Sequence, residues 1–217
     1  MSPLPAMSTP APRSKEIKSV CVFCGSGPGA DPIYVKEAEE LGKALAQNNY
    51  NLIYGGGSVG VMGAVAKALI DNGGTGKAIV PEPLYKHGSK QILEAIVVPD
   101  MHTRKRTMGD LCDAFIVLPG GYGTMEEMLE MITWSQLNIH SKPILLLNTK
   151  GYFDLFTQWI DHAVKENFVK SENTRIFKSC DSVEQLLESL KTYEAPMSRF
   201  GLSWTTSVDG ESGRELI

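Results

Sequence analysis

The sequence contains a stretch suited to holding a phosphate group beside reactive carboxylates. The apolar residues 116–118 lead into residues 119–124, which read PGGYGT, and Glu126 and Glu127 follow. Glycines let backbone N–H groups approach an oxyanion closely, and a helix N-terminus favours negative charge there. Two acids would repel a bound anion, so the pair suggests chemistry next to the phosphate. The alternative, which spacing alone leaves open, is that both acids only complement the helix dipole.

A second candidate lies in residues 100–108, which include the consecutive cations Arg104, Lys105 and Arg106. A basic triplet by itself is more often a solvated face. This one begins just beyond a predicted strand and one strand before the PGGYGT turn, where a crevice would hold a phosphate. Its position therefore favours a functional role, whereas His102 is interpreted as an exposed histidine at a helix start.

Residues 55–63 read GGGSVGVMG and contain the spacing GxGxxG between a predicted strand and a predicted helix. Such a spacing can mark a dinucleotide site, with Glu82 as the acid that binds the ribose. A lone match is weak evidence, and the second glycine loop at residues 120–123 argues against NAD. We expect both glycine turns to line one nucleotide crevice at the carboxyl ends of the strands.

Cys21 and Cys24 form a CxxC motif, which can indicate redox or metal chemistry. They fall in a predicted buried strand, where residues three apart point to opposite faces. No second CxxC motif or histidine pair completes a zinc site. We therefore expect buried free thiols and no metal site.

The composition excludes several classes of function. The chain has 217 residues, of which 42% are hydrophobic, and a formal net charge of -4. It has no long basic run, so neither nucleic acid nor a membrane surface is an expected partner. No apolar segment reaches the roughly 18 residues of a spanning helix. Residues 1–14 lack the apolar core of a secretory signal, so we predict a cytoplasmic protein.

Strand and helix patterns alternate and predict a single-domain α/β protein with a doubly wound parallel sheet of about seven strands. The domain is expected over residues 17–193, with a disordered arm at 1–16 and a flexible tail at 194–217. Residues 82–91 are expected to form a polar connection. The predicted strands cover residues 17–24, 50–54, 76–80, 95–98, 113–118, 143–147 and 175–179. Two of the predicted helices begin near Thr124 and at Tyr152, the second with Phe153, Phe156 and Trp159 facing inward.

Residues 119–127 match PGGxGTxxE and resemble the signature of the Lonely Guy family of cytokinin-activating phosphoribohydrolases. Four further blocks match in the same order, at residues 24–26, 54–63, 101–105 and 132–134. The resemblance covers about residues 17–193. Many members carry a lysine decarboxylase label, but this sequence has no evident lysine context for pyridoxal phosphate.

The resemblance implies a Rossmann-like fold and hydrolysis of the N-glycosidic bond of cytokinin riboside 5′-monophosphates, which are N6-modified AMP. The products would be free cytokinin base and ribose 5-phosphate. It also implies no metal or redox cofactor, and a homodimer or higher homo-oligomer with its site near the interface. The implied catalytic residues are Arg104 and Glu127. The implied substrate-binding residues are Gly25, Ser26, Gly57, Ser58, Met101, Lys105, Gly120, Gly121, Tyr122, Gly123, Thr124, Met125, Glu126 and Thr133.

The chemistry of the residues agrees with this activity. Cleaving a ribosyl bond develops positive charge on the sugar, and a nearby carboxylate stabilises that charge or activates water. We expect Glu127 in that role, with Glu126 holding ribose hydroxyls. Two alternatives remain: an AMP-preferring phosphoribohydrolase, and a non-catalytic nucleotide or molybdenum-cofactor carrier of the same fold. Residues 82–89, where plant-like members usually carry a glutamate, leave the N6 selectivity open, and the helix over 124–137 is the expected subunit contact.

Overall fold

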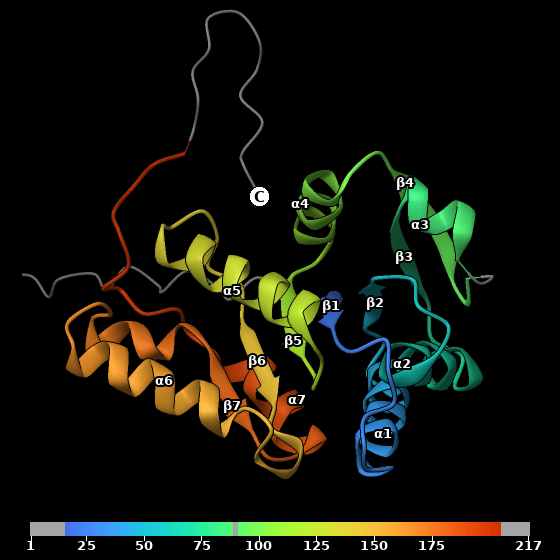
Figure 1. Cartoon of the computed structure of the whole chain (residues 1–217), viewed down its shortest axis with the longest axis horizontal. Helices are drawn as coiled ribbons and strands as arrows, with labels where there is room; N and C mark the ends of the chain where they lie inside the picture. Colours follow the sequence, from blue (N-terminus) through green and yellow to red (C-terminus); the bar gives the residue numbers. More distant parts are fainter. Residues whose placement is uncertain (1–15, 89–90, 205–217) are drawn as a thin grey trace, which may run out of the picture.

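A computed structural model describes residues 16–88 and 91–204, which are built around one seven-stranded parallel sheet (Figure 1). The strands are β1 (Ser19–Phe23), β2 (Asn51–Tyr54), β3 (Gly76–Pro81), β4 (Glu94–Val98), β5 (Ala114–Val117), β6 (Ile144–Leu147) and β7 (Lys178–Cys180). Their order is β4-β3-β2-β1-β5-β6-β7. The chain thus builds outward from β1 in one direction and then returns to place β5 on the other side of β1. The predicted fold class is confirmed.

Helices cover both faces of the sheet. One face carries α1 (Ile33–Gln47), α2 (Gly60–Asp71) and α7 (Val183–Thr192), and the other carries α4 (Met101–Leu111), α5 (Tyr122–Gln136) and α6 (Asp154–Lys165). Figure 1 shows α4 and α5 on the opposite side of β1 and β2 from α1 and α2. Two short 3₁₀ segments, η1 (Thr149–Gly151) and η2 (Ser171–Ile176), complete the fold. No helix in the described part of the chain is long and apolar enough to cross a bilayer.

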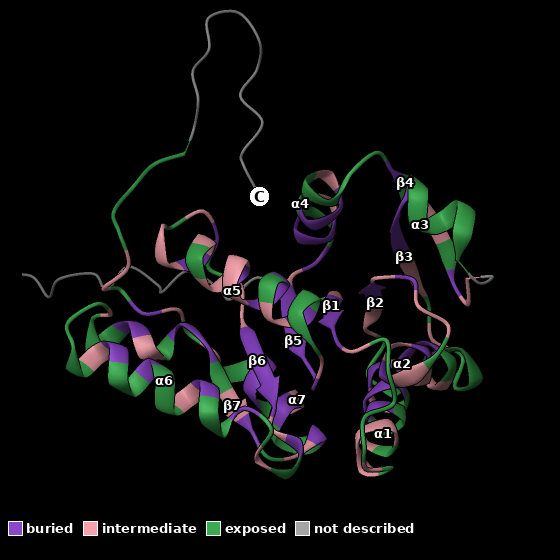
Figure 2. Cartoon of the chain, in the orientation of Figure 1, coloured by how far each residue is buried: buried purple, intermediate pink, exposed green. Residues whose placement is uncertain are grey.

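The inner strands β1, β5 and β6 are buried on both faces, as Figure 2 shows, whereas the edge strands β4 and β7 are partly exposed. Val20 and Val22 of β1 pack toward α1 and α2, whereas Cys21 and Phe23 pack toward α4 and α5. This double burial explains why the strands read as nearly continuous apolar runs. Cys21 and Cys24 fall in opposite core clusters, and both are buried free thiols, as predicted.

The prediction of a polar connection at residues 82–91 is wrong for its first part, which forms α3 (Glu82–His87). Pro83 fits the first helical turn, where its missing N–H has no partner to lose. Lys86 pairs with Glu82 one turn earlier at 2.6 Å, a spacing that supports a helix. The proline in the first turn and this ion pair both favour a helix in a segment whose polar composition suggested a loop.

Three other boundaries or orientations differ from the predictions. The helix expected near Thr124 begins at Tyr122, because Gly121 is its N-cap and Gly123 is already helical. Trp159 does not face inward: it is 54% exposed, and Ile160, four residues after Phe156, takes the buried position. The last strand begins three residues later than predicted, at Lys178, because η2 occupies the preceding segment.

Most of the predicted arm and the outer part of the predicted tail lie outside the described residues. The described part of the tail runs along the C-terminal end of α5. The backbone N–H of Phe200 donates to the carbonyl of Gln136 at 2.9 Å, and Nε1 of Trp204 donates to the carbonyl of Leu137 at 2.8 Å. The contacts of the domain thus extend beyond residue 193.

Candidate active site

A cleft of about 550 Å³ opens at the carboxyl ends of the strands. Its walls come from the turns after β1, β2 and β5, from the end of β3, and from the starts of α4 and α5. The strand order reverses between β1 and β5, which is where open α/β sheets bind their ligands. The two glycine turns therefore face one crevice.

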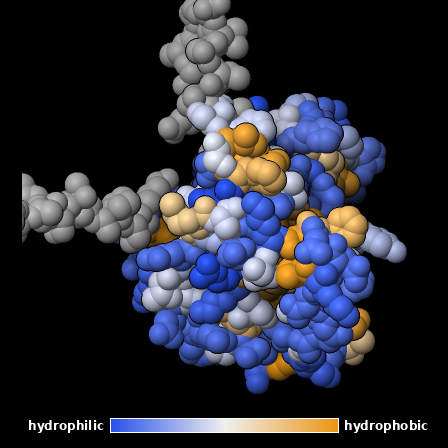
Figure 3. All heavy atoms as spheres, turned by 90° about the vertical axis from the view of Figure 1, so that its left-hand side faces the viewer, coloured by the Kyte–Doolittle hydropathy of each residue, from blue (hydrophilic) through white to orange (hydrophobic). Residues whose placement is uncertain are grey.

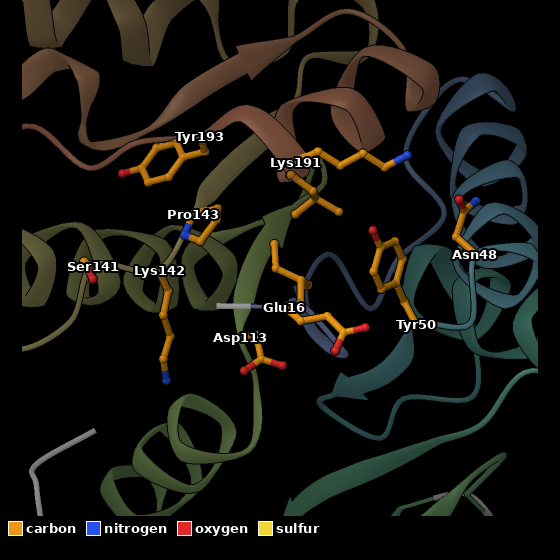
Figure 4. A pocket seen from close by; sticks show the side chains of 11 residues that line it. Glu16, Asn48, Tyr50, Asp113, Ser141, Lys142, Pro143, Lys191 and Tyr193 are labelled. Atoms are coloured by element: carbon orange, nitrogen blue, oxygen red, sulfur yellow. The ribbon is translucent and has the colours of Figure 1, made fainter. Parts of the chain in front are cut away.

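A second cleft of about 540 Å³ lies at the opposite ends of the strands (Figure 4). Ile17 and Tyr50, which border it, precede β1 and β2. Asp113 at this cleft accepts hydrogen bonds from the backbone N–H groups of Lys18 and Ser19 at 3.0 and 3.1 Å. The Asp113 carboxylate therefore has a structural role at the start of β1. Because open α/β sheets bind ligands at the carboxyl ends of their strands, the first cleft is the candidate active site.

A buried ion pair lies at the base of the candidate site. Nη1 of Arg104 on α4 donates to Oε1 of Glu127 on α5, and each residue is only 7% exposed. Nε of Arg104 also donates to the carbonyl of Ile79 at 3.1 Å, which fixes the guanidinium in two directions. A Cβ at Gly55 would collide with the guanidinium, so the glycine after β2 makes room for Arg104. Burial raises the pKa of the Glu127 carboxyl, and Arg104 opposes that rise.

The three consecutive cations have different environments, which corrects the prediction that all three face a phosphate. Only Arg104 borders the cleft. Lys105 is buried, and its Nζ pairs with Glu126 and, at 2.8 Å, with Glu130. Burial lowers the pKa of Lys105, but these carboxylates outweigh that effect and the pKa is raised. Arg106 is exposed.

The turn after β5 has the features of an oxyanion cradle. The carbonyl of Pro119 accepts a hydrogen bond from the N–H of Gly25 at 3.0 Å, which holds the turns after β5 and β1 together. A Cβ at Gly120 would collide with the hydroxyl of Thr124, whereas a Cβ at Gly121 would meet no atom within 4 Å. The first N–H groups of α5 have no partner within the helix. They lie at the cleft, where the positive end of the helix favours an anion.

The structure brings most of the predicted site residues into the cleft and places the others outside its lining. Met125 packs against the core, and the hydroxyl of Thr133 donates to the carbonyl of Leu129 at 2.8 Å on an exposed face of α5. Ser58, Lys105 and Gly120 also fall outside the lining. Those that line it are Gly25, Ser26, Gly57, Met101, Arg104, Gly121, Tyr122, Gly123, Thr124, Glu126 and Glu127.

Sequence reasoning missed several lining residues. Gly56, with φ of 87°, packs so closely on Val80 that only a glycine fits. The glycine run at residues 55–57 was a signal for this close approach. Apolar residues such as Leu84 carried no signal of their own. Gly55, Gly56 and Met62 belong to the turn at residues 55–63 that was expected to line the crevice. The residues missed altogether are Cys24, Val80, Leu84, Gly88 and Gln91.

No group of three or more histidine, cysteine, aspartate or glutamate side chains with a metal-binding arrangement occurs among the described residues. The polar groups at the cleft are instead a cation–carboxylate pair, a second carboxylate, a hydroxyl and backbone N–H groups. This set can bind a phosphate and stabilise positive charge within the same cleft.

The chain is similar in sequence to a known protein family and to curated plant proteins. A family model described as "possible lysine decarboxylase" matches residues 62–190. The chain is 47% identical over 196 residues to cytokinin riboside 5′-monophosphate phosphoribohydrolase LOG2 of Arabidopsis thaliana, covering 88% of this chain and 92% of that protein. It is 42% identical to the phosphoribohydrolase LOG of Oryza sativa subsp. japonica, covering 88% and 80%.

Solved structures share the fold. The molybdenum-cofactor carrier protein of Chlamydomonas reinhardtii superposes with a TM-score of 0.62 at 20% identity, covering 82% of this chain and 98% of that one. The molybdenum cofactor binding protein of Rippkaea orientalis gives the same TM-score at 23% identity and the same coverage. At these identities the likeness concerns the architecture alone.

Proposed function

Because the chain belongs to the Lonely Guy family of cytokinin riboside 5′-monophosphate phosphoribohydrolases, we propose that it hydrolyses the N-glycosidic bond of these nucleotides. The products are the free cytokinin base and ribose 5-phosphate. The observation that carries the proposal is the buried Arg104–Glu127 pair beside the glycine turn at the start of α5. It combines a carboxylate with an anion cradle in one cleft.

The proposed mechanism assigns a task to each polar group of the cleft. The N–H groups of Gly121 and Gly123 and the hydroxyl of Thr124 bind the 5′-phosphate at the positive end of α5. Binding energy from this remote group positions the bond to be broken. The Glu127 carboxylate stabilises the positive charge that develops on the ribose or activates the attacking water. Arg104 keeps Glu127 oriented, and Glu126 holds ribose hydroxyls.

Product release from three compounds tests the reaction. We expect free base from isopentenyladenosine 5′-monophosphate, slower release from AMP, and little from isopentenyladenosine, which lacks the phosphate that the cradle binds. Chromatographic separation of base from nucleotide measures each rate. Faster release from AMP would keep the chemistry and favour the AMP-preferring alternative. Binding of both nucleotides without release from either would favour a non-catalytic carrier.

We also propose that the protein is a homo-oligomer in which α5 lies at the subunit contact and the site is near the interface. Figure 3 shows that hydrophobic residues on one face gather in separate patches within a largely hydrophilic surface. At the cleft, Tyr122 is 98% exposed and Met101 is 45% exposed. Exposed apolar surface next to a site is typical of a protein contact.

Light scattering at micromolar concentration measures the assembly. We expect a mass at least twice that of one 217-residue chain, because a contact that covers these apolar side chains removes them from water. The mass of a single chain at that concentration would contradict the proposal.

We further place the protein in the cytoplasm, a setting in which four free cysteines are ordinary.

A further inference from the structure

Tyr152, which follows β6 and η1, contacts the turn after β5 from outside the cleft. This turn, residues 119–124, is the proposed phosphate-binding turn and is called the phosphate turn below. Its hydroxyl donates to the carbonyl of Gly120 at 2.5 Å, although the two residues are 32 positions apart. The preceding carbonyl, that of Pro119, accepts from the N–H of Gly25 at 3.0 Å. Both carbonyls at the centre of the turn therefore have a donor, and their peptide planes are fixed.

The orientation of these planes decides where the N–H groups point. In a trans peptide the C=O and the N–H of the next residue point in opposite directions, and no cis peptide occurs in the described part of the chain. The bond from Tyr152 to the Gly120 carbonyl therefore directs the N–H of Gly121 away from Tyr152, and Gly121 borders the cleft. We propose that Tyr152 is a positioning residue that aims this N–H at the 5′-phosphate, an inference that rests on the proposed function.

The ring of Tyr152 is held by two other aromatic rings. Tyr34 contacts it edge-on, with centroids 6.0 Å apart and an interplanar angle of 80°. Phe153 makes a similar contact at 5.2 Å and 84°, and Phe153 itself is only 1% exposed. Aromatic pairs favour such edge-to-face contacts. Although Tyr152 is 42% exposed, these two ring contacts and the hydrogen bond to Gly120 hold its hydroxyl at the turn, as a positioning role requires.

The backbone that presents Tyr152 is also fixed. Lys150 and Gly151 both have left-handed conformations, with φ of 54° and 71°, and they turn the chain just before Tyr152. Nζ of Lys150 pairs with Asp31 at 2.7 Å, in the segment that joins β1 to α1. Gly25 lies in the same segment. The turns after β1, β5 and β6 are therefore tied together around the proposed phosphate site, which reduces the cost of organising it when substrate binds.

The Tyr152→Phe variant tests the inference because it removes the hydroxyl and keeps both ring contacts. Isothermal titration calorimetry with ribose 5-phosphate and with isopentenyladenosine separates the phosphate from the base. We expect the affinity for ribose 5-phosphate to fall about three- to tenfold, as for the loss of one hydrogen bond, and the affinity for isopentenyladenosine to stay unchanged. The KM for the nucleotide should rise by a similar factor while kcat changes less.

Tyr193→Phe is the matched control, because the hydroxyl of Tyr193 donates to the carbonyl of Ile176 at 2.6 Å and neither residue lines the cleft. Its affinity for ribose 5-phosphate should equal that of the unmodified protein. Unchanged affinity in Tyr152→Phe, equal weakening of both ligands, or no binding of ribose 5-phosphate by the unmodified protein would overturn the inference. Failure of the proposed function would appear differently, as binding of ribose 5-phosphate that depends on Tyr152 without release of base from any nucleotide.

Discussion

The Glu127→Gln variant is expected to lower kcat for cytokinin riboside 5′-monophosphates by at least about 100-fold, the usual effect of removing one electrostatic contact to a transition state. Glutamine keeps the size of the side chain but cannot carry the negative charge that stabilises the developing cation on the ribose. The KM should change little, because the phosphate turn is untouched. Single-turnover release of base measures the chemical step directly.

Glu130→Gln provides the matched control for that experiment. Like Glu127, Glu130 lies on α5 and pairs with a cation of α4. Its carboxylate is 2.8 Å from Nζ of Lys105, and it does not line the cleft. An exposed or partly exposed ion pair contributes about 0–1 kcal/mol, so a change in kcat below about fivefold is expected. Comparable losses in the two variants would show that cross-linking of α4 and α5, and not the carboxylate at the cleft, is what matters.

Arg104→Ala is expected to lose both activity and stability. The rate should fall at least about 100-fold because Glu127 loses the group that orients it. The free energy of unfolding should fall by about 3–5 kcal/mol, the cost of leaving one partner of a buried ion pair without the other. Urea denaturation followed by circular dichroism measures the second effect.

The stability loss in Arg104→Ala should depend on pH in a defined direction. Burial already raises the pKa of Glu127 in the folded protein, and removing Arg104 takes away the opposing effect. A carboxyl whose folded pKa is raised favours folding below its unfolded pKa, and this contribution is lost as pH rises through the folded pKa. The variant should therefore be more destabilised at pH 8 than at pH 5, relative to the unmodified protein.

The double variant Arg104→Ala with Glu127→Gln separates charge from packing. It has no ionisable group at position 127, so the additional loss between pH 5 and pH 8 should disappear. An Arg104→Ala variant that is equally destabilised at both pH values would contradict the assignment of the penalty to an unpaired Glu127 carboxylate.

The parts of the fold that could be predicted are those that local pattern determines. The continuous apolar runs at β5 and β6 indicated buried parallel strands, and the glycines after β1, β2 and β5 indicated close backbone approaches. Trp159 was misplaced because a helix with exposed aromatic residues offers more than one candidate inward face. The polar segment at α3 was misread because the Glu82–Lys86 pair stabilises a helix that composition does not suggest.

The site could be predicted only in part because its geometry depends on distant segments. The family resemblance implied roles for Arg104 and Lys105, but no spacing distinguishes two adjacent cations, one bordering the cleft and the other paired with Glu126 and Glu130. The bond from Tyr152 to Gly120 joins loops that only the sheet order brings together. Local sequence patterns do not predict hydrogen bonds between loops that are distant in the chain.

The strand order has a consequence for how such a protein can change in evolution. The four strands in one half of the sheet, β4, β3, β2 and β1, all precede residue 100. The three strands in the other half, β5, β6 and β7, all follow residue 113, and β1 pairs with β5 at the seam between the halves. Arg104 is encoded with the first half and Glu127 with the second, so neither half of the gene specifies a complete reaction centre. Recombination between relatives near residue 112 must therefore preserve the fit of both halves at this seam.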